Sequence, residues 1–230
     1  MEHMYSQQLI EQFKSGRKEF SGIHLNFCTL DNIDLSGLVI RDSKLEYTAF
    51  WHSNLNGAKF INCEMFFVSF YTAFLENAAF DNCKIEMTRF DSAMLKNTKI
   101  INSRISYSLC VNANIGELDM RNTSKFKWIT DPSSVSDEDV IDALRVIGNR
   151  TDELPIEIKS EIQRRIDSSL NDFGRDPRLS RISVQEKGTY EQNAQRSADI
   201  YKAMGNFTDG IIKYGSSEIY KAKKPKWPYN

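Results

Sequence analysis

Apolar side chains recur at every fifth position from Phe20 to Met120, without a polar exception and without a change of phase. We call these positions the centres of the repeat. They are Phe20, Leu25, Leu30, Leu35, Ile40, Leu45, Phe50, Leu55, Phe60, Met65, Phe70, Leu75, Phe80, Ile85, Phe90, Leu95, Ile100, Ile105, Cys110, Ile115 and Met120. This period fits neither an amphipathic helix, with about 3.6 residues per turn, nor a strand that alternates every second residue. A fixed short period predicts a solenoid, in which stacked repeats bury a continuous core.

A small or compact residue stands two positions before most of the centres. These residues are Cys28, Ser43, Thr48, Ser53, Ala58, Cys63, Ala73, Ala78, Cys83, Thr88, Ala93, Thr98, Ser103, Ser108 and Ala113. The clearest copies of the repeat are Ala58-Lys59-Phe60, Ala73-Phe74-Leu75, Ala78-Ala79-Phe80 and Ala113-Asn114-Ile115. The repeat therefore has two conserved features of its own, a large apolar centre and a compact residue before it.

This pattern resembles the pentapeptide-repeat family over residues 20–122, slightly under half of the chain. The resemblance implies an all-β solenoid, a right-handed quadrilateral β-helix in which four repeats form one square coil of about 20 residues. It also implies that the centre and the compact residue point inward, whereas the other three residues of each repeat point outward. About five coils, spaced by about 4.8 Å, would give a rod about 24 Å long.

Residues 20 positions apart become neighbours in such coils, so that inward side chains stack into ladders. Phe50, Phe70 and Phe90 predict one aromatic ladder, and Phe60 and Phe80 predict a second on the opposite side. We expect these five rings to form the structural core.

The outward positions predict a rod with one apolar side. One outward column contains Phe27, Tyr47, Phe67, Met87 and Tyr107, and the same corner includes Trp51, Phe66, Tyr71, Phe74 and Met94. The opposite columns are polar, and one of them contains Asp42, Asn62, Asn82, Asn102 and Asn122. A soluble monomer seldom leaves so large an apolar patch open. Either the C-terminal region of the chain or a protein partner, including a second copy, is expected to cover it.

Residues 1–19 are expected to form an N-terminal helical cap, because the end of a solenoid exposes unpaired backbone groups. Leu9, Ile10 and Phe13 fall on one face of a helix over residues 6–15. Ser6 is the predicted N-cap, and Gly16 is expected to end the helix.

After Asn122 the phase of the repeat breaks, since Lys125 occupies the next expected centre. Residues 123–173 predict an exit strand over 126–129 and two helices, the first capped by Ser136 or Asp137 and ending at Gly148-Asn149. The second begins near Pro155 and ends at Phe173-Gly174. We expect a linker over 174–188, C-terminal helices over 189–220 and a basic tail over 221–230.

Composition narrows the classes of partner. The chain has 30 basic and 31 acidic residues, and 40% of its residues are hydrophobic. This balance argues against bulk binding of nucleic acid, although the basic tail could touch it weakly. No apolar run approaches the length of about 20 residues that a membrane helix needs, and the N-terminus lacks a signal-peptide core. A cytoplasmic protein, of bacterial type by its resemblance, is the expectation.

Candidate catalytic chemistry is sparse. The three histidines, His3, His24 and His52, have no metal-ligand spacing, and neither CxxC nor a glycine-rich phosphate loop occurs. His52 is expected to pack beside Trp51 on the apolar side. Cys63 and Cys83 could pair across successive coils, but a cytosolic setting favours four reduced, buried thiols. We therefore predict no catalytic residue, no cofactor and no metal, and hence no enzyme.

Three functions remain open. The first is a non-enzymatic interaction module or scaffold, whose β-helix is bound by its own C-terminal helices or by a protein partner. The family resemblance suggests a second, a DNA mimic that binds gyrase. Residues 20–122 carry 11 acidic and 9 basic side chains, a poor match to the dense charge of duplex DNA. The third is an effector-like protein that uses the β-helix for targeting.

Overall fold

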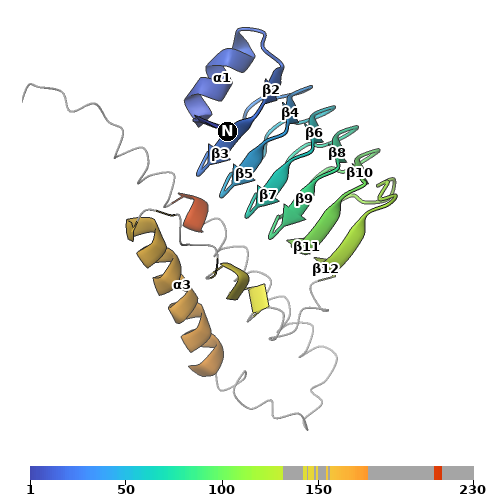
Figure 1. The fold of residues 1–230 in the computed structure, drawn as a ribbon. Coiled ribbons are helices and arrows are strands. Elements are labelled where there is room, and N and C mark those ends of the chain that lie inside the picture. The colour runs from blue at the N-terminus through green and yellow to red at the C-terminus, as the bar shows by residue number, and fades with distance from the viewer. Residues whose placement is uncertain are drawn as a thin grey trace, which may run out of the picture. The chain divides into compact units, whose positions relative to one another are not determined.

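Two short strand rows run in parallel along the first half of the chain (Figure 1). The structure is a computed structural model that describes residues 1–131, 142–143, 145–147, 149, 154, 156–175 and 210–213. It divides into two compact units, one of residues 1–130 with 212–230, and the other of residues 131–211. Each unit is described by itself below.

The centres of the repeat lie on strands that pair with the strand one coil further on. The first sheet has the order β1 (Glu2–Met4), β3 (Ile23–Asn26), β5 (Lys44–Glu46), β7 (Glu64–Phe66), β9 (Lys84–Glu86), β11 (Arg104–Leu109) and β12 (Ser124–Ile129). The second has the order β10 (Lys99–Ile101), β8 (Ala79–Asp81), β6 (Lys59–Ile61), β4 (Val39–Arg41) and β2 (Glu19–Ser21). All pairs are parallel, and Phe20, Ile40 and Phe60 stand opposite one another in successive coils.

Isolated β-bridges mark the two remaining sides of each coil. Thr29 pairs with Ala49 and Ala49 with Ser69 on one side, and Asn54 pairs with Phe74 on the other. These bridges keep the same spacing of 20 residues as the sheets. The coil therefore has four sides of one pentapeptide each, which confirms the parallel β-solenoid that the five-residue period predicted.

The aromatic rings predicted for the core are fully buried. Phe50 stacks on Phe70, and Phe70 stacks on Phe90, with 5.2 Å between ring centroids in both pairs. Phe60 stacks on Phe80 at 4.9 Å. The two ladders also meet across the coil, where the rings of Phe60 and Phe70 pack edge to face at 5.7 Å. Each ring thus combines a stacked neighbour in the next coil with an edge contact inside its own.

The N-terminal end of the rod is closed by a strand and a helix. β1, which the sequence pattern did not reveal, pairs in parallel with β3 and extends the first sheet by one strand. Helix α1 (Ser6–Lys14) follows and buries Leu9 and Phe13. The predicted N-cap was wrong by one residue, because Tyr5 is the N-cap and Ser6 is already helical. The Ser6 hydroxyl instead accepts a hydrogen bond of 3.0 Å from the backbone N–H of Thr29 and ties the helix to the first coil.

The opposite end of the ladder continues past the break in the apolar phase. β12 pairs with β11 in the established register, so that Lys125 stands opposite Ile105. The polar centre is tolerated because this is the last strand of the sheet, and Lys125 is exposed. Trp128 lies half-buried at this end, with its ring centroid 5.8 Å from that of Phe90. The predicted exit strand is therefore one further row of the β-helix.

Part of the expected helical region lies within the described residues. Residues 142–143 and 145–147 are helical, within the first helix predicted after the β-helix. Helix α3 (Ile156–Arg175) contains the second predicted helix and ends just beyond Gly174. It buries Ile162 and Ile166, two members of the predicted apolar stripe. The predicted helix over 189–204, the basic tail and the linker beyond Arg175 lie outside the described residues.

The four thiols are buried and free. Cys63 and Cys83 donate to backbone carbonyl oxygens of the preceding coil, at 3.5 Å from Ile40 and 3.3 Å from Phe60. Burial raises the pKa of Cys110 to about 12, because the thiolate would lose its hydration, and the nearby Asp91 carboxylate adds to the effect. These cysteines occupy the inward slots as small apolar residues.

Phe70→Asp should unfold the β-helix, because it places an unpaired carboxylate between Phe50 and Phe90 in a ladder that excludes water. We expect a loss of roughly 4 kcal/mol or more in the free energy of unfolding, measured by urea titration with far-UV circular dichroism. Phe70→Leu is the matched control and should stay folded. A folded Phe70→Asp variant would contradict the inward position of this ladder.

Cys110→Ala should weaken the alkaline sensitivity of the β-helix. The folded thiol keeps its proton up to about pH 12, whereas an unfolded thiol ionises near 9, so stability is lost as the pH rises between these values. Urea titrations at about pH 8 and about pH 11 measure this loss, and it should be smaller in the variant. Equal losses in the two proteins would show that Cys110 does not contribute to it.

Candidate interaction surface

The corners of the coils impose a strict backbone requirement on the outward residues. The residue two positions after most centres has a left-handed backbone, with φ between 48° and 58° wherever it is not glycine. Glycine, asparagine and aspartate adopt this conformation at low cost, whereas a bulky side chain there is an outlier. The amino acids at the corners therefore show where a bulky side chain is present despite its backbone cost.

Three of the four corner columns carry small or polar residues. These columns are Gly22, Asp42, Asn62, Asn82, Asn102 and Asn122; Asn32, His52, Thr72, Ser92 and Asn112; and Gly37, Gly57, Asn77 and Asn97. The fourth column differs in kind, because it carries Phe27, Tyr47, Phe67, Met87, Tyr107 and Lys127. The apolar column found in the sequence is thus the one corner where bulky side chains occupy a left-handed backbone.

The ten residues predicted for the apolar side divide into three groups. Six are buried, namely Phe27, Tyr47, Trp51, Phe66, Phe67 and Met87, and Tyr71 and Tyr107 are half-buried. We call these eight residues the aromatic flank. Phe74 and Met94 pair with each other across coils on the adjoining side, with 46% and 37% of their surface exposed. They therefore do not belong to the same buried surface.

Stacking along the rod accounts for part of this burial. The rings of Phe27 and Tyr47 lie parallel at 4.6 Å between centroids, and those of Tyr47 and Phe67 lie tilted at 5.3 Å. Phe66 approaches Tyr47 edge to face at 5.6 Å. Stacking covers the faces of the rings but leaves the outer edges of an outward column open. Phe67 nevertheless has no exposed surface, so its outer edge is covered as well.

The other corners show what an uncovered column looks like. Their exposed members include Asn32, Asp42, His52, Asn62, Asn77, Asn82, Asn97, Asn102, Asn112 and Asn122. Equivalent backbone geometry thus leads to exposure at three corners and to burial at the fourth.

Polar residues that the sequence did not single out complete the flank. The indole N–H of Trp51 donates to the Ser69 hydroxyl at 2.9 Å. One coil further along the Trp51–Tyr71 column, Asp91 forms an ion pair of 2.7 Å with Arg89, and both side chains are almost wholly buried. Their position 20 and 40 residues from apolar flank members was the available signal.

Further contacts hold the buried ion pair in place. The second carboxylate oxygen of Asp91 accepts a hydrogen bond of 3.1 Å from the backbone N–H of Val111. The guanidinium carbon of Arg89 lies 5.0 Å from the centroid of the Tyr71 ring. A buried ion pair needs such additional partners to offset its desolvation. The flank therefore combines an apolar surface with oriented polar groups.

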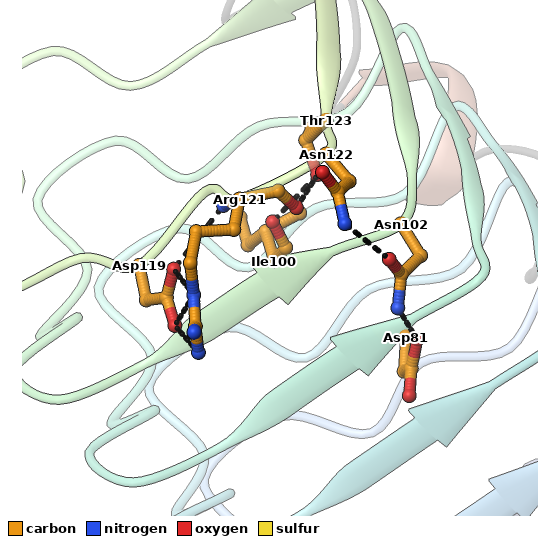
Figure 2. Close-up of polar contacts among 7 residues, drawn as sticks. All are labelled: Asp81, Ile100, Asn102, Asp119, Arg121, Asn122 and Thr123. Atoms are coloured by element: carbon orange, nitrogen blue, oxygen red, sulfur yellow. Dashed lines mark hydrogen bonds and ion pairs between the residues drawn. The ribbon is translucent and has the colours of Figure 1, made fainter.

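The polar side of the rod is organised differently. Asn122 donates to Asn102 at 3.2 Å, and Asn102 donates to Asp81 at 2.9 Å, in the chain of amides that Figure 2 shows. Next to them, the Arg121 guanidinium donates to Asp119 and holds the pKa of that carboxyl below its usual range. These groups satisfy one another on an exposed surface. This side has the character of a solvated structural ladder.

The described residues do not assemble a catalytic or metal centre. His24 lies 2.7 Å from the carboxylate of Glu46, whereas His52 is exposed and hydrogen-bonds Thr72, so that it does not pack into the apolar side as predicted. No three His, Cys, Asp or Glu side chains within the described ranges converge as metal ligands. No helix among these residues has the length and apolarity to cross a membrane.

Comparisons with known proteins bear on the fold. No protein-family model and no curated protein matches the chain. Among solved structures, the pentapeptide-repeat protein Rfr23 from the cyanobacterium Cyanothece 51142 matches 54% of this chain and 99% of its own, with 12% identity and a TM-score of 0.51. The pentapeptide-repeat protein alr5209 from Nostoc PCC 7120 matches 51% of this chain and 97% of its own, with 21% identity and a TM-score of 0.32.

QnrB1, described as a plasmid-mediated fluoroquinolone resistance protein, matches 46% of this chain and 54% of its own length, with 22% identity and a TM-score of 0.43. The likeness to Rfr23, together with the unbroken five-residue period and the parallel coils, identifies the fold. Residues 20–122 form the β-helix of the pentapeptide-repeat proteins.

Proposed function

We propose that this protein is a non-enzymatic interaction module whose β-helix binds a protein segment on the aromatic flank. The occupant is either the chain's own C-terminal region or a protein partner. The single observation that carries the proposal is the corner column of Phe27, Tyr47, Phe67, Met87 and Tyr107, which combines left-handed backbone with buried bulky side chains.

The backbone cost of this column supports the proposal. Left-handed backbone costs a side chain with a Cβ about 1–2 kcal/mol, and asparagine or glycine would lower this cost. Asn77 and Asn97 occupy the same position in another column of the same coils. Bulky residues at this corner are therefore not needed to turn the chain. Contacts made by their side chains must offset the cost, as is common where backbone strain marks a binding surface.

The polar groups of the flank support a specific rather than a generally sticky surface. Trp51 directs its N–H to Ser69, and the Arg89–Asp91 pair is fixed by Val111. Buried anchors of aromatic and arginine type are characteristic of the parts of interfaces that contribute most binding energy. A docked segment would read both the apolar rings and these oriented groups.

The charges of the rod favour this proposal over mimicry of DNA. Arg41 pairs with Glu19 at 2.5 Å, and Lys44 approaches Glu64 at 3.7 Å, each across successive coils. Lys84 similarly lies 3.6 Å from Glu86. Such pairs mix the two signs along the surface, whereas duplex DNA presents one negative charge for about every 1.7 Å of its axis.

Phe67→Asn tests the docking surface without disturbing the coil. Asparagine suits the left-handed corner, so the far-UV circular dichroism and a cooperative urea transition should be retained. The variant removes a central ring of the flank and should loosen whatever lies over it. Binding of the dye ANS should therefore increase several-fold in the full-length chain, because Tyr47 and Met87 become accessible.

Asn77→Ser, at a polar corner of the next coil side, is the matched control and should change neither the fold nor ANS binding. Loss of the β-helix signal in Phe67→Asn would show that Phe67 is a core residue rather than a docking residue. Unchanged ANS binding in a folded Phe67→Asn variant would show that no docked segment depends on this ring, and would refute the proposal.

A further inference from the structure

One described segment outside the β-helix coils makes contact with the aromatic flank. The ammonium of Lys213 lies 5.2 Å from the centroid of the Trp51 ring. Lys213 and Trp51 belong to the same compact unit, which joins residues 212–230 to residues 1–130. This distance is within the range of a cation–π interaction, for which tryptophan is the best aromatic partner.

Trp51 is suited to this role by the way in which its ring is held. Its N–H is already engaged by Ser69, which fixes the orientation of the indole. Only 8% of its surface is exposed. The part of the ring that remains for recognition is its π face, and a π face selects a cation rather than a hydrogen-bond donor or acceptor of other kinds.

The residue before Lys213 contributes the apolar half of the contact. Residues 210–213 are helical, and Ile212 has no exposed surface, whereas Lys213 is exposed. Ile212 and Lys213 therefore present a buried aliphatic side chain next to a cation that reaches from solvent to the indole face. This arrangement allows the lysine to keep its hydration while its stem covers apolar surface.

We infer that the occupant of the aromatic flank at Trp51 is this chain's own segment at Ile212-Lys213, which acts as a cover in cis. The inference rests on the proposed docking function of the flank and names its occupant. A protein partner that uses the same surface must displace this segment. Such a partner would offer the same chemistry, an aliphatic residue beside a lysine or arginine.

Acrylamide quenching of Trp51 fluorescence in the full-length chain tests the inference. Trp128 and Trp227 are replaced by phenylalanine, so that Trp51 is the only emitter. Ile212→Asp should expel the segment, because a carboxylate cannot remain in a wholly buried aliphatic site. The Stern–Volmer constant of Trp51 should then rise several-fold. Ile156→Asp, at an isoleucine that is 68% exposed, is the matched control and should leave it unchanged.

Lys213→Glu is the second variant, since this exposed side chain can be changed without burying a charge. It places a carboxylate over the negative face of the indole and should raise quenching in the same direction while the circular dichroism of the β-helix is retained. Quenching that is unaltered in folded Lys213→Glu and Ile212→Asp variants would overturn the inference.

Dilution separates a cover in cis from one supplied by a second copy. Protection of Trp51 should be independent of protein concentration, and protection that is lost on dilution would assign the flank to a second copy and overturn the inference. The proposed function is judged separately by Phe67→Asn. If that variant binds ANS while Ile212→Asp leaves Trp51 protected, the flank is a docking surface with a different occupant.

Discussion

Hydrogen bonding of each coil to the next, in a constant register of 20 residues, is the constraint on which the rest of the structure depends. Within one side of the coil, Ser69 donates back to Thr48 at 2.9 Å, and Phe50 donates forward to Ser69 at 2.8 Å. Because every backbone stretch is held between two neighbours, side chains 20 positions apart must stack. The phenylalanine ladders, the amide ladder and the aromatic flank are three consequences of this one register.

The same register makes the corners informative. Four right-angled turns per coil require left-handed residues, and the requirement recurs whatever the side chain. At three corners the chain meets it with residues such as Asn62, Asn77 and Asn112. At the fourth corner it accepts strained aromatic residues, so that stability of the backbone and contacts of the side chains act in opposite directions there. A site of interaction is the physical explanation that reconciles them.

Most of the rod could be predicted from the sequence, because a period of five is local and survives without knowledge of distant contacts. The N-terminal strand could not, since three residues such as Glu2–Met4 carry no periodicity of their own and pair with β3 only once helix α1 has turned the chain. The Arg89–Asp91 pair was missed for a related reason. Charged residues at outward positions are normally solvated, and only their shared side of the coil shows that these two are buried.

The sequence by itself determined which side chains point inward, which stack upon one another and on which side of the rod the aromatic residues gather, because these follow from the period and the coil length alone. Only the tertiary structure decided that Phe67 is covered while Phe74 is exposed, and that Lys213 approaches Trp51. Burial of an outward residue depends on what lies over it. For Trp51, a contacting residue lies some 160 positions further along the chain, at Lys213, beyond the reach of any local pattern.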